Sequence, residues 1–596
     1  MLSLTARRAR AATVWALVVS TAAAAETDQQ VLQQFAQATA MPAPQISQGA
    51  DGNTQLTWNT TLDLSVYRNT QSGGAMLNPN AGGGFYKFQF GTDYKLVTEG
   101  DVTRWAQVQL TQSDDRTVQR FSFFTNKVLL GYSQPGVTVN VGDLALSHSQ
   151  LSANLPIRGA SAQKFLGPLV ITGAGGVFGE DWRSVFDRRV RTAYPRESYA
   201  MKVGSSPTAF DTAAPLLKGL EIYATVQRFR DLTTTQDQSP LLTTSAAGAQ
   251  GASATVGASF KRDSVSVAAE FARSRFERSD IGRDRDQAFV SEFSWQGDPV
   301  ALRFGHQNIG ADFATLATLS PGTRESFGNA VWKALPTLSF TLDGRQSRYV
   351  PSSRTALIAP AEPPKPTPDP FAPPNPTPTA VKLSGMTASE SGSLTANWTP
   401  TEPAGFSITA TAGRATTRQL DSDSRTRNDN ASATVNYSRD GWTATANVTA
   451  QRNQSLGSSP GTASTDAATM TLGKTFSDDS NQRSLNTMLA YMKQWQVNGA
   501  TATQSEARGW NDRWTLTLGL NLTGKGSFNG TAFYGHMKDP VSGAVGKQQG
   551  VQAELVWQMN PKWSFKLFGR DNRNWQTLAA QAYSDRSIGV AVVGSF

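Results

Sequence analysis

Residues 55–66 read QLTWNTTLDLSV, and apolar and polar side chains alternate along this stretch. One parity holds mainly large apolar residues, and the other holds only polar ones: Gln55, Thr57, Asn59, Thr61, Asp63 and Ser65. Successive side chains of a β-strand point to opposite faces, so a period of two predicts a strand with one apolar and one polar face. Residues 55–66 are therefore expected to form a strand that lies between an apolar environment and a polar one.

The same pattern recurs along the rest of the chain. FYKFQFGTDYKL (85–96), WTLTLGLNL (514–522) and VQAELVW (551–557) alternate in the same way. Short turns rich in Gly, Pro, Asn or Asp, such as SQPG at 133 and RDG at 439, alternate with longer polar loops. Counting these segments predicts about 26 antiparallel strands, or 24 or fewer if residues 144–190 form an internal plug instead.

Composition excludes several classes of function. The chain has no cysteine and only three histidines, far apart, so we expect no metal site and no cofactor. Its net charge of +9 comes from basic residues spread thinly along the chain, which argues against a nucleic-acid partner and fits an anionic lipopolysaccharide surface. No Ser/His/Asp arrangement or paired carboxylates indicate catalysis, so we expect a protein that is not an enzyme.

The N-terminus has the features of an export signal. Three arginines (Arg7, Arg8 and Arg10) precede an apolar stretch and then Ala23-Ala24-Ala25, which predicts a signal peptide over residues 1–25. Residues 26–54 are then expected to form a short periplasmic segment. Val31, Leu32, Phe35 and Ala36 have helical spacing, so this segment holds either a short helix or a frayed leader.

The last residues, RSIGVAVVGSF (586–596), carry a second signal. Ile588, Val590, Val592 and Phe596 share one parity, and this stretch resembles the C-terminal signature of Gram-negative outer-membrane β-barrel proteins, a porin-like superfamily. The resemblance implies that the barrel-assembly machinery reads these residues. It also implies localisation in the bacterial outer membrane and an all-β fold over residues 55–596. The expected fold is a single large transmembrane antiparallel barrel with short periplasmic turns and long extracellular loops.

Residues on the polar parity are the candidates for lining a pore. They are mostly neutral and hydrophilic, and the clearest are Gln55, Asn59, Asp63, Lys87, Gln89, Asp93, Lys95, Gln107, Gln109, Arg513 and Asn521. The loop FGEDWRSVFDRRVRTAYP (178–195) gathers Trp182, Arg183, Arg188, Arg189 and Arg191. This loop is expected either to narrow the pore or to contact lipopolysaccharide phosphates.

Residues 346–390 form the longest predicted outer loop, and APAEPPKPTPDPFAPPNPTPT (359–379) within it is too rich in proline for a strand. The segment before the first strand is too short for a plug domain. We therefore predict an outer-membrane channel for transport or export of a bulky hydrophilic cargo. The alternatives are a scaffold barrel that sheaths a partner protein, as in porin–cytochrome conduits, or a barrel for surface display. Expected partners are outer-membrane lipid, lipopolysaccharide, the barrel-assembly machinery and a protein that fills or gates the lumen.

Overall fold

The computed structural model describes residues 45–48 and most of residues 54–595. Within residues 54–595 the stretches left out lie mainly between strands, and the longest of these are 232–248 and 352–384. The predicted signal peptide, the predicted helix near residues 31–36, the proline-rich stretch and Phe596 lie outside the described residues.

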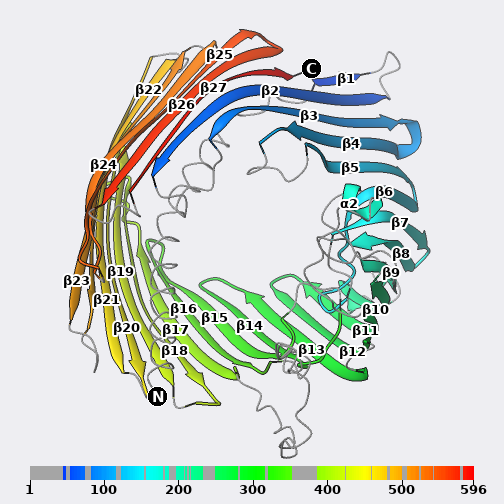
Figure 1. The fold of residues 1–596 in the computed structure, drawn as a ribbon. Coiled ribbons are helices and arrows are strands. Elements are labelled where there is room, and N and C mark those ends of the chain that lie inside the picture. Colours follow the sequence, from blue (N-terminus) through cyan, green and yellow to red (C-terminus); the bar gives the residue numbers. More distant parts are fainter. Residues whose placement is uncertain are drawn as a thin grey trace, which may run out of the picture.

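The chain forms one antiparallel sheet of 27 strands, which curls into the ring seen in Figure 1. The first fourteen strands are β1 (Gln45–Gln48), β2 (Gln55–Gly73), β3 (Gly83–Thr98), β4 (Val102–Ser113), β5 (Phe123–Gln134), β6 (Val137–Ala145), β7 (Pro156–Leu166), β8 (Leu169–Phe178), β9 (Arg196–Ser205), β10 (Leu220–Asp231), β11 (Ala249–Arg262), β12 (Val265–Arg278), β13 (Gly282–Gln296) and β14 (Val300–Ile309).

The remaining strands are β15 (Thr323–Leu335), β16 (Leu338–Tyr349), β17 (Thr387–Trp398), β18 (Phe406–Gln419), β19 (Arg425–Arg439), β20 (Trp442–Leu456), β21 (Gly461–Ser477), β22 (Arg483–Asn498), β23 (Ala507–Leu522), β24 (Gly526–Lys538), β25 (Val545–Asn560), β26 (Trp563–Gln576) and β27 (Tyr583–Ser595). The described helical segments are a 3-10 turn, η1 (Glu99–Asp101), and one short helix, α2 (Trp182–Phe186). No helix among the described residues is long and apolar enough to cross a membrane.

The barrel closes because the last strand pairs with the second. β27 runs antiparallel to β2, from Thr61 opposite Ser595 to Gly73 opposite Tyr583. The strands β2 to β27 therefore form a closed barrel of 26 strands, which confirms the predicted count and leaves no open edge between β2 and β27. β7 and β8 belong to this wall, so the alternative of a plug over residues 144–190 is wrong for these strands.

The short strand β1 lies beyond the end of β27 on the same edge of β2. Gln45 pairs with Trp58 and Gln48 with Gln55, whereas the pairing of β27 stops at Thr61. β1 therefore continues the line of β27 along the part of β2 that β27 does not reach.

Most connections at one end of the barrel are short turns. β19 and β20 are joined by Asp440 and Gly441, which have φ values of 53° and 75°. A two-residue hairpin with positive φ at both positions is the turn that Asp-Gly sequences favour, because glycine has no Cβ to clash. The link between β9 and β10, at residues 206–219, is the long exception at this end.

β7 and β8 are rich in glycine, and their backbones approach each other closely. A Cβ added to Gly159 would lie 2.0 Å from the carbonyl oxygen of Gly175, and one added to Gly176 would lie 2.3 Å from that of Arg158. Only glycine permits this close approach of two backbones.

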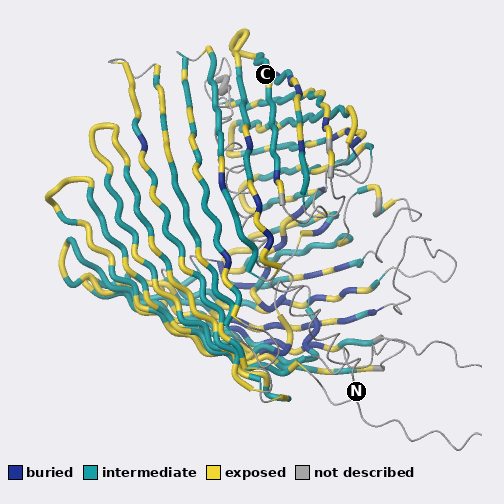
Figure 2. The backbone as a smooth tube through the Cα atoms, turned by 60° about the vertical axis from the view of Figure 1, so that its left-hand side comes forward, coloured by how far each residue is buried: buried dark blue, intermediate teal, exposed yellow. Residues whose placement is uncertain are grey.

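The barrel has no continuous central core. Figure 2 shows the buried residues as short stretches scattered along the strands. The buried apolar side chains form three small clusters, which contain Leu144 and Ile157, Leu151 and Phe313, and Phe229 and Ala314. Each of these clusters includes a residue of a connecting segment, namely Leu146, Leu151 with Phe313, and Ala314, so they mark places where these segments pack against the wall.

Candidate functional site

The pairing of the strands places all eleven predicted pore-lining residues on one face of the sheet. Asp63 lies opposite Gln89, and Asn59 opposite Asp93, which in turn lies opposite Gln107. From Asp63 the same face continues through β27, β26, β25 and β24 to Arg513 and Asn521. The other parity carries the exposed apolar side chains, such as Trp58, Leu64 and Val66. The polar residues therefore line the inner face of the barrel, and their role in a pore stays a prediction.

Six consecutive strands, β17 to β22, present an inner wall without charge. Over their whole described length, their inward positions hold only Ser, Thr, Asn, Gln, Gly, Ala and two methionines. The centre of this uncharged wall consists of Ser393, Thr395, Thr409, Thr411, Asn430, Ser432, Thr434, Asn447, Thr449, Ala467 and Thr469.

Neighbouring side chains of the uncharged wall bond to one another. Thr395 and Thr411 share a hydrogen bond of 3.0 Å between their hydroxyls, and the Asn447 amide donates to the Thr434 hydroxyl at 2.6 Å. Each hydroxyl and amide offers further donors and acceptors to the lumen. The wall is thus a broad hydrogen-bonding surface that exerts little electrostatic force on ions.

Charged residues gather on the rest of the inner face, where they pair closely. Lys566 lies 2.6 Å from Glu554, and Arg303 lies 2.7 Å from Glu292. Figure 1 shows β19–β21 on the opposite side of the ring from β7–β9. The lumen therefore has an uncharged side and a side of compensated charges.

A connecting segment folds inward against this charged side. Residues 146–152 follow the last residue of β6, Ala145. Within them, the backbone N–H groups of Gln150 and Leu151 each donate to the Glu270 carboxylate at 3.0 Å. Glu270, on β12, also accepts a hydrogen bond from the Tyr223 hydroxyl. Leu151 is fully buried, and its carbonyl accepts from the Thr315 hydroxyl at 2.7 Å.

A second segment, residues 310–315, packs beside the first one. Phe313 and Leu151 share a buried cluster with Ala272, Ala288 and Ile309 from the inner wall. We call residues 146–152 the inner segment. Together the two segments cover the inner face of β10–β14, so they narrow the interior on that side.

His148 of the inner segment is 5% exposed. Burial lowers the pKa of its imidazole below the ordinary value, and the ammonium of Lys202 lowers it further. Lys202 also lies 3.3 Å from Glu221 and 4.3 Å from the centre of the Tyr223 ring. The docked position of the inner segment therefore favours neutral His148.

Acidification is expected to release the inner segment. Below a pH of about 6.5 the histidine of the released segment binds a proton that the docked one does not bind, so docking weakens by up to about tenfold per pH unit until the docked pKa is reached. The reactivity of a single cysteine at position 152 with a maleimide, divided by that of the same cysteine in an unfolded peptide at each pH, should increase between pH 7.5 and 5. The division removes the loss of reactive thiolate that acidification itself causes. The same cysteine in a His148→Gln background should show no such increase, and a pH-independent wild-type segment would contradict this prediction.

The predicted arginine-rich loop is described only over α2. The Trp182 indole N–H donates to the Asp143 carboxylate at 2.9 Å, and the Arg158 guanidinium lies 5.8 Å from the Trp182 ring. Arg183 lies on α2 and is exposed, whereas Arg188, Arg189 and Arg191 lie outside the described residues. The helix is thus anchored to β6 and β7, and the role of the loop as a constriction or lipid contact stays a prediction.

Comparison with known proteins gives matches at the level of the fold. No family model matches the sequence, and no curated protein matches it either. Among solved structures, the P pilus usher (PapC) translocation pore is 11% identical, with 91% of this chain and 99% of that chain covered and a TM-score of 0.34.

Two further structures match over different shares of the chain. The ferric enterobactin receptor PfeA from Pseudomonas aeruginosa is 12% identical, with coverage of 90% of this chain and 81% of that chain and a TM-score of 0.37. Salmonella typhi OmpF is 12% identical and covers 50% of this chain, with a TM-score of 0.27. The structural neighbours of this chain are therefore outer-membrane β-barrel proteins, at an identity that shows the fold alone.

Proposed function

We propose that this protein is an outer-membrane channel that carries a bulky, hydrophilic and uncharged cargo. The uncharged wall of β17–β22 is the observation that carries this proposal. Six strands of hydroxyls and amides replace the hydrogen bonds of a hydrated cargo without selecting for its charge. In addition, the described part of this wall has no inward aromatic ring on which a cargo would stack, which favours passage over retention.

The outer face of the barrel supports placement in a membrane. Exposed tryptophans lie near the tight-turn ends of their strands: Trp58, Trp332, Trp398, Trp442 and Trp557. At the opposite ends lie Tyr199, Trp495, Tyr534 and Trp575, which are also exposed. Exposed aliphatic side chains such as Leu64, Leu342 and Val448 occupy the band between. Two aromatic girdles around an apolar band are typical of transmembrane barrels.

Single-channel recording in a planar bilayer tests the channel directly. The purified protein should give stable openings, and uncharged dextrans added to the bath should reduce the current in a size-dependent manner as they enter the lumen. A Thr449→Glu and Asn447→Asp double variant should admit anionic dextran sulfate less well while neutral dextran enters as before. If the purified protein conducted no current until a bound protein was removed, this result would instead support the alternative of a scaffold barrel that sheaths a partner protein.

A further inference from the structure

Three pairs of arginines lie directly opposite each other on neighbouring strands. The pairs are Arg275 with Arg285 on β12 and β13, Arg324 with Arg348 on β15 and β16, and Arg418 with Arg425 on β18 and β19. We call these six residues the arginine pairs. All of them lie at the end of the barrel opposite the Asp440-Gly441 turn, where the long links 232–248 and 350–386 also lie.

The arginine pairs point away from the lumen. Arg275 shares its parity with the exposed Val267 of β12, and Arg348 shares its parity with Leu342, which is 58% exposed. Arg425 shares its face with Val448 through the pairing of Ala433 and Val448. All six side chains are exposed. They therefore form part of the outer surface, above the apolar band.

Like charges directly opposite each other on a sheet destabilise it. Nearby outward arginines have acidic partners: Arg230 lies 2.8 Å from Glu197, and Arg283 lies 3.1 Å from Glu277. Among the described residues, none of the six arginine pair members makes an ion pair or side-chain hydrogen bond. The positive charge of these three sites is therefore uncompensated within the part of the chain that the structure describes.

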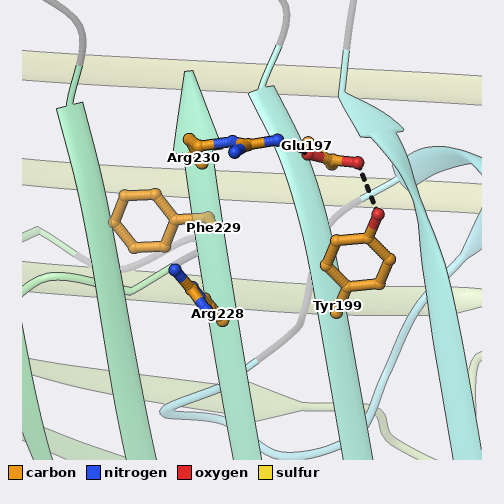
Figure 3. Close-up of a pocket in the computed structure, with 5 residues that line it drawn as sticks. All are labelled: Glu197, Tyr199, Arg228, Phe229 and Arg230. Atoms are coloured by element: carbon orange, nitrogen blue, oxygen red, sulfur yellow. Dashed lines mark hydrogen bonds and ion pairs between the residues drawn. The ribbon is translucent and has the colours of Figure 1, made fainter. Parts of the chain in front are cut away.

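A small pocket extends this surface to the neighbouring strands. Figure 3 shows Arg228 and Arg230 on β10 beside Glu197 and Tyr199 on β9, with Phe229 between the two arginines in sequence. The Arg230 guanidinium is occupied by Glu197, and the Tyr199 hydroxyl donates to the same carboxylate. Arg228 lies in one row with Ala252, Arg275 and Arg285 across β10–β13. This row therefore carries three guanidiniums without an ion pair to any described residue, and only the small side chain of Ala252 separates Arg228 from the other two.

We propose that the arginine pairs bind the phosphate groups of phosphorylated lipids in the outer leaflet of the membrane. Two guanidiniums side by side match the oxygens of a phosphate, since each arginine presents a planar fork of N–H donors. The acyl chains of such a lipid lie against the apolar side chains below the pairs, among them Val256, Phe289, Phe304 and Leu342. This assignment rests on the membrane placement in the proposed function. It concerns only the outer surface of the barrel, so it does not depend on which cargo passes through the lumen.

Lipid binding is measured with the full chain purified in mild detergent. The probe is lipopolysaccharide whose lipid A carries both phosphates. The control ligand is the same lipopolysaccharide after phosphatase treatment. The variants are R275Q/R285Q, R324Q/R348Q and R418Q/R425Q. The control is R573Q/R586Q, which removes two outward arginines that already share the Asp571 carboxylate at 2.9 and 2.8 Å. Correct assembly of each variant is checked by its heat-dependent migration on a gel.

At the substituted pair the affinity for the phosphorylated probe should fall on the order of tenfold, so each pair variant should bind about one third less probe than the wild type. The control should bind like the wild type, and dephosphorylated lipid should bind all proteins equally weakly. Without lipid, the pair variants should melt at the same temperature as the wild type or higher, because the repulsion is gone. With lipid, each pair variant should gain less stability than the wild type and the control, because it has lost one of the three sites, and this difference would not follow from a structural role of the arginines.

Unchanged binding by all three pair variants would overturn the assignment. Equal affinity for inorganic phosphate would also overturn it, because the site would then recognise a free anion and not a lipid. A barrel that binds the probe as expected but conducts nothing would contradict the proposed channel and leave the lipid sites intact. The two proposals therefore fail separately.

Discussion

Replacing Glu270 by alanine is expected to release the inner segment and to increase the single-channel conductance on the order of twofold, because the lumen widens. The Glu270 carboxylate accepts hydrogen bonds from the backbone N–H groups of Gln150 and Leu151. Hydrogen bonds to a charged group contribute about 1.5–3 kcal/mol each, so losing two of them costs at least about 3 kcal/mol, or a factor of about 150 in the docking equilibrium.

Two measurements check the release of the inner segment. The chain has no cysteine, so a Ser152→Cys variant carries a single thiol at a position that is fully buried in the docked state. In the Glu270→Ala background this thiol should react with a maleimide at near the rate of a free peptide. Glu292→Ala is the matched control, because Glu292 is also an inner carboxylate but bonds to Arg303. A conductance increase of equal size in the control would contradict the anchoring role.

Arginine in place of Val448 is expected to destabilise the membrane-embedded barrel by about 2–4 kcal/mol. Val448 lies in the middle of β20, is 58% exposed and points outward, where the apolar band would meet the lipid chains. A charged side chain at that depth has no aqueous partner. Urea unfolding in lipid vesicles, followed by tryptophan fluorescence, measures the loss.

The neighbouring residue supplies the control for Val448. Thr449→Arg adds the same side chain one position along β20, on the inner face and within the uncharged wall. Its effect should stay below about 1 kcal/mol, because the guanidinium reaches water in the lumen. If both substitutions destabilised the barrel equally, or if Val448→Arg had no effect in vesicles, the outer face would not be in contact with lipid.

Most of the fold follows from local sequence. The period-two alternation that begins at Gln55 recurs in most strands from β2 to β27 but is faint in β7 and β8, and alternation depends only on neighbours along the chain. The tight turns are equally local, as the positive φ values of Asp440 and Gly441 illustrate. These signals sufficed to predict a closed barrel of 26 strands and to assign its inner face.

The inner segment could not be predicted in the same way. Residues 146–152 read as a polar loop, and their anchor, Glu270, lies 119 residues from Leu151. On its own strand, Glu270 looks like any other polar residue of the inward parity. The arginine pairs were missed for a related reason: Arg324 and Arg348 become neighbours only through the register of β15 and β16. Long-range pairing, and not local pattern, creates both features.

The absence of charge on the described inner face of β17–β22 has a consequence for how the lumen responds to the surrounding medium. Fixed charges act over a Debye length of about 10 Å at 0.1 M ionic strength and about 30 Å at 0.01 M. Dilution of the medium therefore extends the field of the charged side further across the lumen, but it leaves the hydrogen bonds of the opposite wall unchanged. The flow of small ions through the barrel would thus depend on salinity, whereas the path of a neutral solute along the other wall would not.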